Sequence, residues 1–323
     1  MEAKKPKIFI TGVSGQLGTC LKELLSSGLG YYFPKEYERA FQCLENYEVV
    51  YGDRIAGEGV RAFDLSDSNL ASHLSAMAPR LIINPAAWTA VDLSEVKIDE
   101  TFAINAKSVE QMAIWCQKND VPFIHYSTDY VFDGSGVNPR KETDPTGPIQ
   151  VYGSSKLEGE KNLFLHHKKA VCIRTSWVIS HVGVNFVKTM LRLGSEREIL
   201  KIVKDQIGAP TDAMLLAEVS LIIAARILTE DGYDFPWGTY HLSGRGETNW
   251  HEFALQIFSE AKKLEFPLLV KEVSGITSQE YPTPAKRPTN SRLDLSKIET
   301  TLGLKIPSWQ AGLERVLNRL KRD

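Results

Sequence analysis

The residues that decide the fold are 7–18, which read KIFITGVSGQLG. The apolar run 7–11 is typical of a buried strand, and leucines at helical spacing follow from residue 16 to about residue 26. Between them, three glycines permit a tight turn and let the backbone approach a pyrophosphate at a helix N-terminus, where free N–H groups and the helix dipole favour an anion. The pattern predicts a dinucleotide site at Gly12, Ser14, Gly15, Gln16 and Leu17, with a plain glycine-rich turn as the alternative.

The alternation of strands and helices continues through the first half of the chain. Strand-like runs occur at 48–51, 81–84, 123–127 and 171–174, and helical stretches at 68–77 and 98–118 lie between them. Strands that alternate with helices form right-handed βαβ units and a parallel sheet covered on both faces. The sequence therefore predicts the α/β class, with a Rossmann-type doubly wound parallel sheet.

After residue 175 the pattern becomes less regular. Helical stretches at 185–193, 213–228 and 249–263 alternate with short extended pieces at 199–203 and 239–242, and a proline-rich loop covers 281–288. This half predicts a smaller α/β lobe that binds the substrate. We expect residues 1–175 to form mainly the NAD(P)-binding domain and residues 176–323 mainly the substrate lobe, with the chain crossing between the two.

Residues 28–47 interrupt the regular pattern. They are aromatic and charged and lengthen the connection before the second strand. We interpret them as a surface insertion with a short helix at 36–44, without a chemical role that the residues indicate.

Composition excludes several classes of function. The formal net charge of −2 gives no general attraction to nucleic acid or to an anionic membrane, and no apolar run approaches the roughly 18 residues that span a bilayer. The four cysteines show no metal-ligand spacing, which indicates reduced thiols. Residues 1–7 do not resemble a signal peptide. We expect a cytoplasmic protein with neither a nucleic-acid nor a membrane partner.

The candidate catalytic pair is Tyr152 and Lys156. Four residues apart on a helix, their side chains project from one face, and a neighbouring ammonium lowers the pKa of a tyrosine toward the working range. Alone the motif is weak, and Tyr31 with Lys35 is a second match, which we interpret as coincidence because Pro34 separates them and no strand precedes them. Tyr152 instead follows a strand that ends near Thr128, whose hydroxyl can bond the substrate oxygen or serve only as a turn residue.

Other strand ends supply candidates for the remainder of the cofactor site. They are Asp64, Leu65, Ala86, Ala87, Thr89 and Asn105. Asp64 could equally cap a helix beginning at Ser66. Asp53 could accept from a ribose hydroxyl and favour NADH, whereas Arg54 could hold a 2′-phosphate and favour NADPH, so both cofactors stay open.

These residues resemble a known superfamily. The glycines together with Thr128, Tyr152 and Lys156 resemble the extended short-chain dehydrogenase/reductases. More narrowly, five blocks resemble the dTDP-4-dehydrorhamnose reductases, and they are AAWTAVD at 86–92, HYSTDYVF at 125–132, RTSWV at 174–178, DQIGAPT at 205–211 and RPTNSRL at 287–293. The resemblance covers residues 7–320 apart from 28–47.

The resemblance implies an activity and roles for residues. It implies that NADPH or NADH reduces the 4-keto group of dTDP-4-dehydro-6-deoxy-L-mannose to give dTDP-L-rhamnose. Tyr152 would protonate the oxygen that Thr128 holds, and Lys156 would tune Tyr152 and anchor the nicotinamide ribose. Substrate-binding roles are implied for Tyr130, Trp177, Gln206, Arg287 and Arg292. Trp177 could instead be a core aromatic residue, and the two arginines could be surface residues.

The resemblance also raises the question of a metal. Some family members join two subunits through Mg²⁺ held by acidic residues, one of them in the first helix. The matching position here is Cys20, a poor Mg²⁺ ligand, although Glu196 matches another. We therefore predict no metal, and a homodimer is left open.

Two other readings compete. The regulatory β subunit of methionine adenosyltransferase is similar to this family and binds without catalysis, but it departs from the reductases at the strand-end hydroxyl and at the RTSWV and QxGxPT blocks that this chain keeps. A nucleotide-sugar epimerase or dehydratase would share the cofactor half. A dehydratase is expected to place an Asp-Glu pair after the hydroxyl, where this chain has Asp129-Tyr130.

Overall fold

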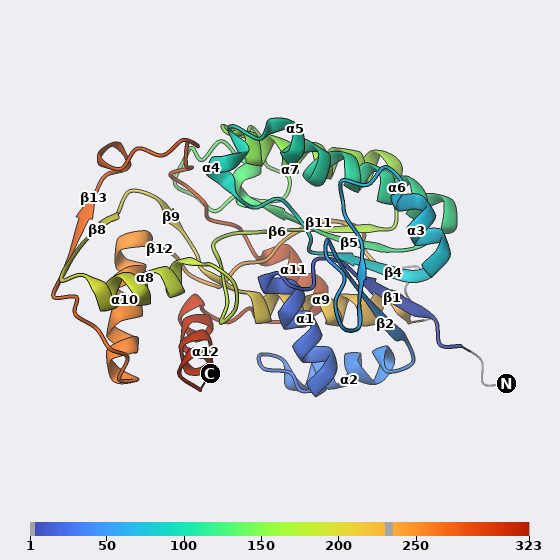
Figure 1. Ribbon diagram of the computed structural model, residues 1–323, viewed down its shortest axis with the longest axis horizontal. Helices are drawn as coiled ribbons and strands as arrows, with labels where there is room; N and C mark the ends of the chain where they lie inside the picture. The colour runs from blue at the N-terminus through green and yellow to red at the C-terminus, as the bar shows by residue number, and fades with distance from the viewer. Residues whose placement is uncertain (1–3, 230–234, 323) are drawn as a thin grey trace.

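Seven parallel strands form the central sheet of the computed structural model, which describes residues 4–229 and 235–322 (Figure 1). The strands are β1 (Lys7–Ile10), β2 (Glu48–Asp53), β3 (Val60–Ala62), β4 (Pro79–Asn84), β5 (Phe123–Thr128), β6 (Ala170–Thr175) and β11 (Gly238–His241). Their order is β11-β6-β5-β4-β1-β2-β3, so the chain starts inside the sheet and winds outward in both directions. This order confirms the predicted Rossmann-type fold.

Helices cover both faces of the sheet, which explains why its strands are apolar on both sides. On β1, Phe9 belongs to one buried cluster, whereas Ile8 and Ile10 belong to the cluster on the opposite face. One face carries α3 (Leu70–Met77), α6 (Ser108–Asn119) and α7 (Val151–His166). The other carries α1 (Gln16–Ser27), α2 (Pro34–Leu44), α9 (Ala213–Leu228) and α11 (Ser296–Leu302).

A smaller lobe has its own apolar core, at the left of Figure 1. Its elements are β7 (Val178–Ile179), α8 (Phe186–Glu196), β8 (Ile199–Val203), β9 (Ile207–Gly208), β10 (Thr211–Asp212), β12 (Thr248–Asn249), α10 (Trp250–Lys263), β13 (Glu272–Ile276) and α12 (Trp309–Arg322). Its strands pair two by two, as β8 with β13, β7 with β10 and β9 with β12. No helix among the described residues is both long and apolar enough to cross a membrane.

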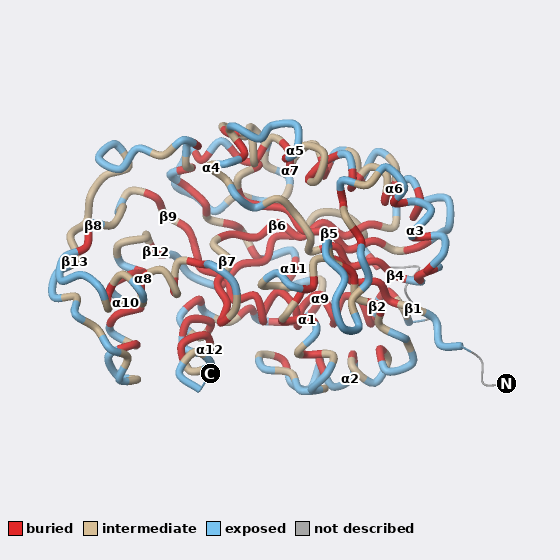
Figure 2. Tube along the Cα trace, viewed as in Figure 1, coloured by how far each residue is buried: buried red, intermediate tan, exposed pale blue. Residues whose placement is uncertain are grey.

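The second half of the sequence also contributes to the central sheet. Nearly all of α9 is buried, because it packs against α1 and α2 (Figure 2). β11 pairs with β6 in parallel at the edge of the sheet. Residues 213–228 and 238–241 are therefore part of the body that the first half begins.

The short helix predicted at 36–44 is present as part of α2, but residues 28–47 pack on the body of the molecule and do not lie free on its surface. α2 packs against α9, and Tyr37 and Leu44 join the main core. The backbone N–H groups of Tyr31, Tyr32 and Phe33 donate to the Glu218 carboxylate of α9 at 2.6–2.9 Å. The segment fastens α9 to the sheet body, and its residues Phe33 and Tyr37 are buried there, whereas Tyr31 is exposed.

The predicted helix at 98–118 is divided. α5 (Ile98–Phe102) passes into a π-helical turn at Ala103–Lys107 before α6 begins at Ser108. A π-turn inserts one extra residue and re-aims the side chains around it. Asn105 lies in this turn, and Gly159 of α7 packs so closely that an added Cβ would lie 2.2 Å from the Asn105 carbonyl oxygen.

Candidate active site

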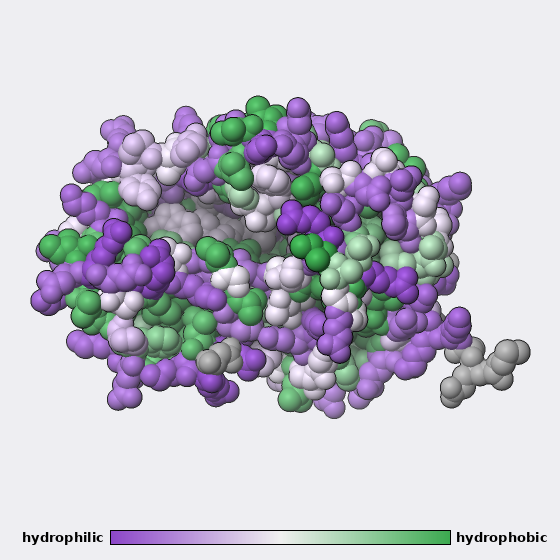
Figure 3. Space-filling view, in the orientation of Figure 1, coloured by the Kyte–Doolittle hydropathy of each residue, from purple (hydrophilic) through white to green (hydrophobic). Residues whose placement is uncertain are grey.

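A cavity of about 650 Å³ lies between the carboxyl ends of the parallel strands and the smaller lobe. Its size suits a small-molecule site. The molecule is hollowed between its two parts on the face drawn in Figure 3. The walls carry residues from the glycine turn, from the ends of β4, β5 and β6, from α7, and from the start of α10.

The glycine turn forms one wall. Gly12 has φ +57°, and a Cβ there would lie 2.8 Å from the Ala86 Cα. At Gly18 a Cβ would lie 2.2 Å from the Gly12 carbonyl oxygen, so α1 can start this close to β1 only with glycine. Gly15 is the N-cap and makes no side-chain capping bond, and the first turn of α1 has no acidic residue. The turn therefore fits the phosphates of a dinucleotide.

The remaining predicted residues of the turn also line the cavity. They are Ser14, Gln16 and Leu17. Asp53, at the end of β2, accepts from the N–H and the hydroxyl of Ser14 at 2.8 and 2.7 Å and from the Arg54 N–H at 2.7 Å. Both of its oxygens are engaged by the protein, whereas the exposed Arg54 side chain reaches the cavity.

Five of the other predicted cofactor residues line the cavity, and one does not. Asp64, Leu65, Ala86, Ala87 and Thr89 lie in its walls. Asp64 does not cap a helix at Ser66, because its carboxylate accepts from the N–H and hydroxyl of Ser66 in a turn, and α3 begins only at Leu70.

Asn105 is buried outside the cavity wall. Its side chain bonds the Trp88 N–H at 2.8 Å, the Trp88 carbonyl at 3.0 Å and the Ser155 hydroxyl at 3.0 Å. Its side-chain amide is thus already bonded within the protein, and its contact with the cofactor stays a prediction. Asn105 joins the loop after β4 to α7.

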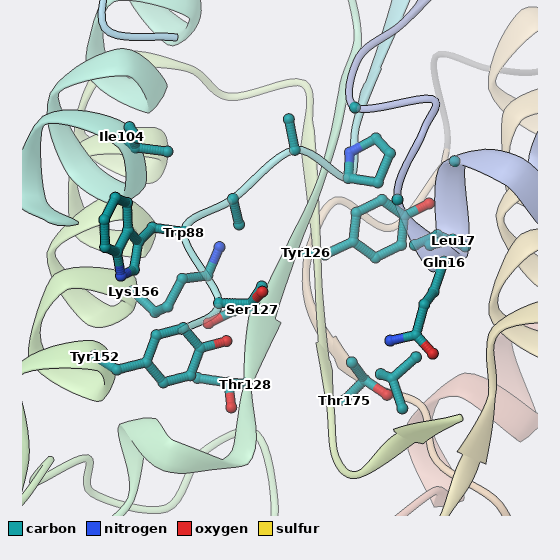
Figure 4. Close-up of a pocket in the computed structure, with 18 of the residues that line it drawn as sticks. Gln16, Leu17, Trp88, Ile104, Tyr126, Ser127, Thr128, Tyr152, Lys156 and Thr175 are labelled. Atoms are coloured by element: carbon teal, nitrogen blue, oxygen red, sulfur yellow. The ribbon is translucent and has the colours of Figure 1, made fainter. Parts of the chain in front are cut away.

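The three predicted catalytic residues meet in the cavity. Tyr152 and Lys156 project from α7, and Thr128 ends β5; Figure 4 shows their polar ends on the side of the cavity opposite Gln16. Thr128 is also a turn residue, since its hydroxyl accepts from the Tyr130 N–H at 3.2 Å. This turn role is compatible with the other interpretation, binding of the substrate oxygen, which stays a prediction.

The electrostatics of the pair differ from the prediction. Burial raises the pKa of Tyr152, the Asp129 carboxylate raises it further, and the Thr128 hydrogen bond lowers it. Lys156 is not among the groups that lower it. Burial reduces the pKa of Lys156 itself to about 8, with Cys172 and Glu160 opposing the shift. At neutral pH Tyr152 is therefore a phenol, the form that can donate a proton.

Asp129 is a buried carboxyl in the same wall. Burial raises its pKa to about 7, while hydrogen bonds from Ser291 and Thr128 act in the opposite direction. Thr128 donates to it at 3.0 Å. Active sites often contain a buried carboxyl group whose pKa is shifted toward neutral pH.

The sugar-side candidates divide into two groups. Tyr130 and Trp177 line the cavity, Tyr130 meeting the Tyr152 ring edge to face at 5.9 Å. Trp177 stacks on Trp250 at 3.7 Å between ring centroids and adopts φ +45°. Strain in a cavity-lining aromatic residue argues against the alternative of a plain core residue.

Gln206, Arg287 and Arg292 do not line the cavity. Gln206 donates to the Ser278 hydroxyl at 2.9 Å and accepts from the Trp250 indole at 3.0 Å. Gln206 therefore holds the Trp250 ring, which stacks on Trp177, in place. Arg292 is ion-paired with Glu247 at 2.5 Å.

Arg287 lies near the edge of the cavity. Its Nη2 pairs with Asp92 at 2.8 Å, and its charge acts on the nearby Tyr130. Its Nη1 is buried and has no hydrogen-bond partner among the described residues.

Sequence reasoning missed several residues of the wall. They include Trp88, Ile104, Ser127, Thr175, Ser176, Val184, Leu216 and Trp250. Four of them, Trp88, Ser127, Thr175 and Ser176, lie within family-like blocks and could have been found there. Trp250 could not, because only the packing of α10 against α8 and the rest of the smaller lobe brings it to Trp177.

The region around Cys20 offers no Mg²⁺-like ligand set. Cys20, Glu23 and His181 lie together, with candidate ligand atoms within 4.8 Å of one another. Burial raises the pKa of Cys20 to about 12, and Glu23 pairs with His181 at 2.8 Å. Glu196 pairs with Arg192. A hard cation requires several oxygen ligands, which these residues do not supply.

The chain is similar to known proteins over nearly its whole length. Residues 6–322 match the family described as RmlD substrate binding domain. The chain is 40% identical to a dTDP-4-dehydrorhamnose reductase of Escherichia coli over 97% of both chains. It is also similar in structure to dTDP-4-dehydrorhamnose reductases of Clostridium acetobutylicum and, in complex with NADP, of Bacillus anthracis. The TM-scores are 0.82 and 0.81, at 32% identity and with 98% of this chain and 99% of each other chain covered.

Proposed function

The chain belongs to the RmlD substrate binding domain family, and on that premise we propose that it reduces the 4-keto group of dTDP-4-dehydro-6-deoxy-L-mannose with NADPH or NADH, forming dTDP-L-rhamnose. The observation that carries the proposal is the meeting of Thr128, Tyr152 and Lys156 beside the glycine turn in one cavity. The Thr128 hydroxyl beside Tyr152 favours catalysis over the non-catalytic alternative, which departs from the reductases at that strand-end hydroxyl.

The bound nicotinamide supplies the hydride, and the protein supplies the proton and the alignment. When the substrate binds, the Thr128 hydroxyl turns its proton from the Asp129 carboxyl to the ketone oxygen and holds that oxygen near Tyr152. As negative charge grows on this oxygen, Tyr152 transfers its phenolic proton to it. The Lys156 ammonium then faces the phenolate and stabilises it until a proton returns.

The direct test is a reduction assay with purified protein. We expect the absorbance of NADPH or NADH to fall when dTDP-4-dehydro-6-deoxy-L-mannose is added, and not when dTDP alone is added. The activity should persist in EDTA, because hydride transfer by these residues requires no Lewis acid, and any homodimer should persist as well. A protein that binds NADPH and leaves the keto sugar unreduced would contradict the proposal.

We place the reaction in the cytoplasm, in keeping with four unpaired cysteines.

Arg54 is expected to select NADPH. Asp53 is held by Ser14, while the Arg54 guanidinium can pair with a 2′-phosphate. Arg54→Ala should raise the KM for NADPH about tenfold and leave the KM for NADH almost unchanged. Arg61→Ala, which removes an exposed arginine outside the cavity, is the control. Equal effects of Arg54→Ala on both cofactors would argue against this role.

Arg287 is expected to grip the diphosphate of the sugar nucleotide. Its unpartnered Nη1 and its place beside Tyr130 support this role. Arg287→Ala should raise the KM for the sugar nucleotide about tenfold and affect the KM for NADPH much less. Arg192→Ala, at an exposed ion pair on α8, controls for the loss of positive charge. Parallel increases in both KM values would count against the placement.

A further inference from the structure

Lys156 has a polar neighbour that the reaction described above does not use. Its Nζ lies 3.4 Å from Nε2 of His125, the only hydrogen-bond partner of this ammonium among the described residues. His125 lies on β5, three residues before Thr128, and is 1% exposed. A histidine buried this deeply requires partners for both ring nitrogens.

The second ring nitrogen begins a chain of buried bonds. Nδ1 of His125 lies 3.1 Å from the side-chain amide of Asn84, at the end of β4. The amide of Asn84 bonds in turn to the hydroxyl of Thr11, which directly precedes Gly12. Thr11 and Asn84 are each 1% exposed. Because β1, β4 and β5 are neighbours in the sheet, this series of hydrogen bonds connects the glycine turn to Lys156 across three strands.

The proton positions in this chain follow from the chemistry of its ends. An ammonium can only donate, so Nε2 of His125 must accept and the ring must be neutral. The single ring proton is then on Nδ1, which requires an acceptor. The structure has the Asn84 amide nitrogen toward Nδ1 and the amide oxygen accepting from the Thr11 hydroxyl. This tautomer therefore requires the amide turned by 180°, so that its oxygen accepts from Nδ1–H and its nitrogen donates to Thr11. Burial and the charge of Lys156 both lower the pKa of His125 well below its usual value, which keeps the ring neutral.

We propose that His125 is a positioning residue for the reduction. Its neutral ring, fixed by Asn84 and Thr11, accepts a hydrogen bond from Lys156, holds the ammonium at the cavity and ties its position to the glycine turn. The roles given to Lys156 rest on the proposed function, whereas the tautomer and the contact do not.

The other groups around Lys156 cannot replace this bond. Glu160, on the same helix, is engaged by Arg174 through two hydrogen bonds of 2.9 and 2.6 Å. Cys172, on β6, is a neutral thiol, because burial raises its pKa well above the usual value. Tyr152 is a neutral phenol. The lone pair of His125 is therefore the nearest acceptor for the charge.

His125→Leu keeps a similar volume and removes the acceptor. In this variant the hydrogen bond that stabilises the charged form of Lys156 is lost. The pKa of Lys156 should therefore fall further, below the present value of about 8. The ammonium is present below its pKa and is lost as the pH rises through it. The alkaline limb of the kcat–pH profile should therefore move to lower pH by roughly one unit in this variant. His125→Gln offers a carbonyl oxygen to Lys156 and should restore the limb.

Nitrogen NMR of the unmodified protein, labelled with ¹⁵N-histidine, tests the same idea without any substrate. The His125 signals, identified by their absence from His125→Gln, should show a neutral Nδ1–H ring from about pH 6 to about pH 9. His166→Gln, near the exposed end of α7, should change neither these signals nor the pH profile.

Three results would overturn the proposal. They are a His125 ring that titrates with an ordinary pKa, a ring with its proton on Nε2, or a folded His125→Leu enzyme whose alkaline limb has not moved. If His125→Leu does not fold, the NMR measurement and His125→Gln still decide. If instead the keto sugar is not reduced at all, the proposed function is wrong. The NMR measurement needs no substrate, so it still tests the His125 tautomer and its contact with Lys156.

Discussion

Tyr152→Phe is expected to lower kcat by about 10²-fold or more while leaving the affinity for NADPH close to that of the unmodified protein. The hydroxyl is the only group removed, and it is the group that donates the proton to the growing alkoxide. Because burial raises the pKa of Tyr152, the phenol is fully protonated at neutral pH, so its loss cannot be offset by a change of pH. Stopped-flow or steady-state absorbance of NADPH gives kcat, and NADPH fluorescence titration gives the affinity.

Tyr31→Phe is the matched control. Tyr31 forms the coincidental Y-x-x-x-K pair with Lys35, is 54% exposed and does not line the cavity. Phenylalanine keeps the ring that the Arg315 guanidinium covers. Turnover should therefore be unchanged in this variant. Near-normal turnover in Tyr152→Phe would remove Tyr152 from the mechanism.

Gly18→Ala and Gly15→Ala should separate folding from cofactor binding. An alanine Cβ at position 18 would lie 2.2 Å from the Gly12 carbonyl oxygen and 2.6 Å from the Val13 Cα, and neither backbone atom can move away cheaply. We expect Gly18→Ala to lower the free energy of unfolding by about 1–3 kcal/mol and to weaken NADPH binding as the turn opens.

At position 15 the space within the protein is less restricted. The added Cβ would lie 3.3 Å from the Gly12 carbonyl oxygen, and the φ of −74° suits alanine. Gly15→Ala should therefore change the free energy of unfolding little, by about 0.5 kcal/mol or less, yet raise the Kd for NADPH at least about tenfold, because the methyl group occupies the space where the phosphates approach. Urea unfolding and fluorescence titration measure the two quantities. Unchanged NADPH affinity in Gly15→Ala would mean that the phosphates do not lie against this turn.

The sequence by itself determined five of the seven strands of the central sheet, and the reacting end of the site. Strand and helix periods are local, so the runs at 7–11, 48–51, 81–84, 123–127 and 171–174 could be located without knowledge of their neighbours. Parallel strands place their carboxyl ends at one edge, which is why the glycine turn and Thr128 had to meet there. Tyr152 and Lys156 followed from their spacing on the next helix.

Only the tertiary structure shows which distant parts of the chain support the sheet and the site. Residues 28–47 look like an insertion in sequence because their partner, Glu218, is almost 190 positions away, and only folding brings that carboxylate to their free N–H groups. The same holds for Trp250, which reaches Trp177 from another helix.

Asn105 shows the limit most clearly. It was expected to face the cofactor, but a π-turn aims it at Trp88 and Ser155. Lys156 does line the cavity, yet its contact with His125 could not be read from the sequence. A local pattern records which side a residue occupies on its own helix. It does not show which buried polar atoms of other strands and helices need a hydrogen bond from that residue. Those atoms come into contact with it only when the chain is folded.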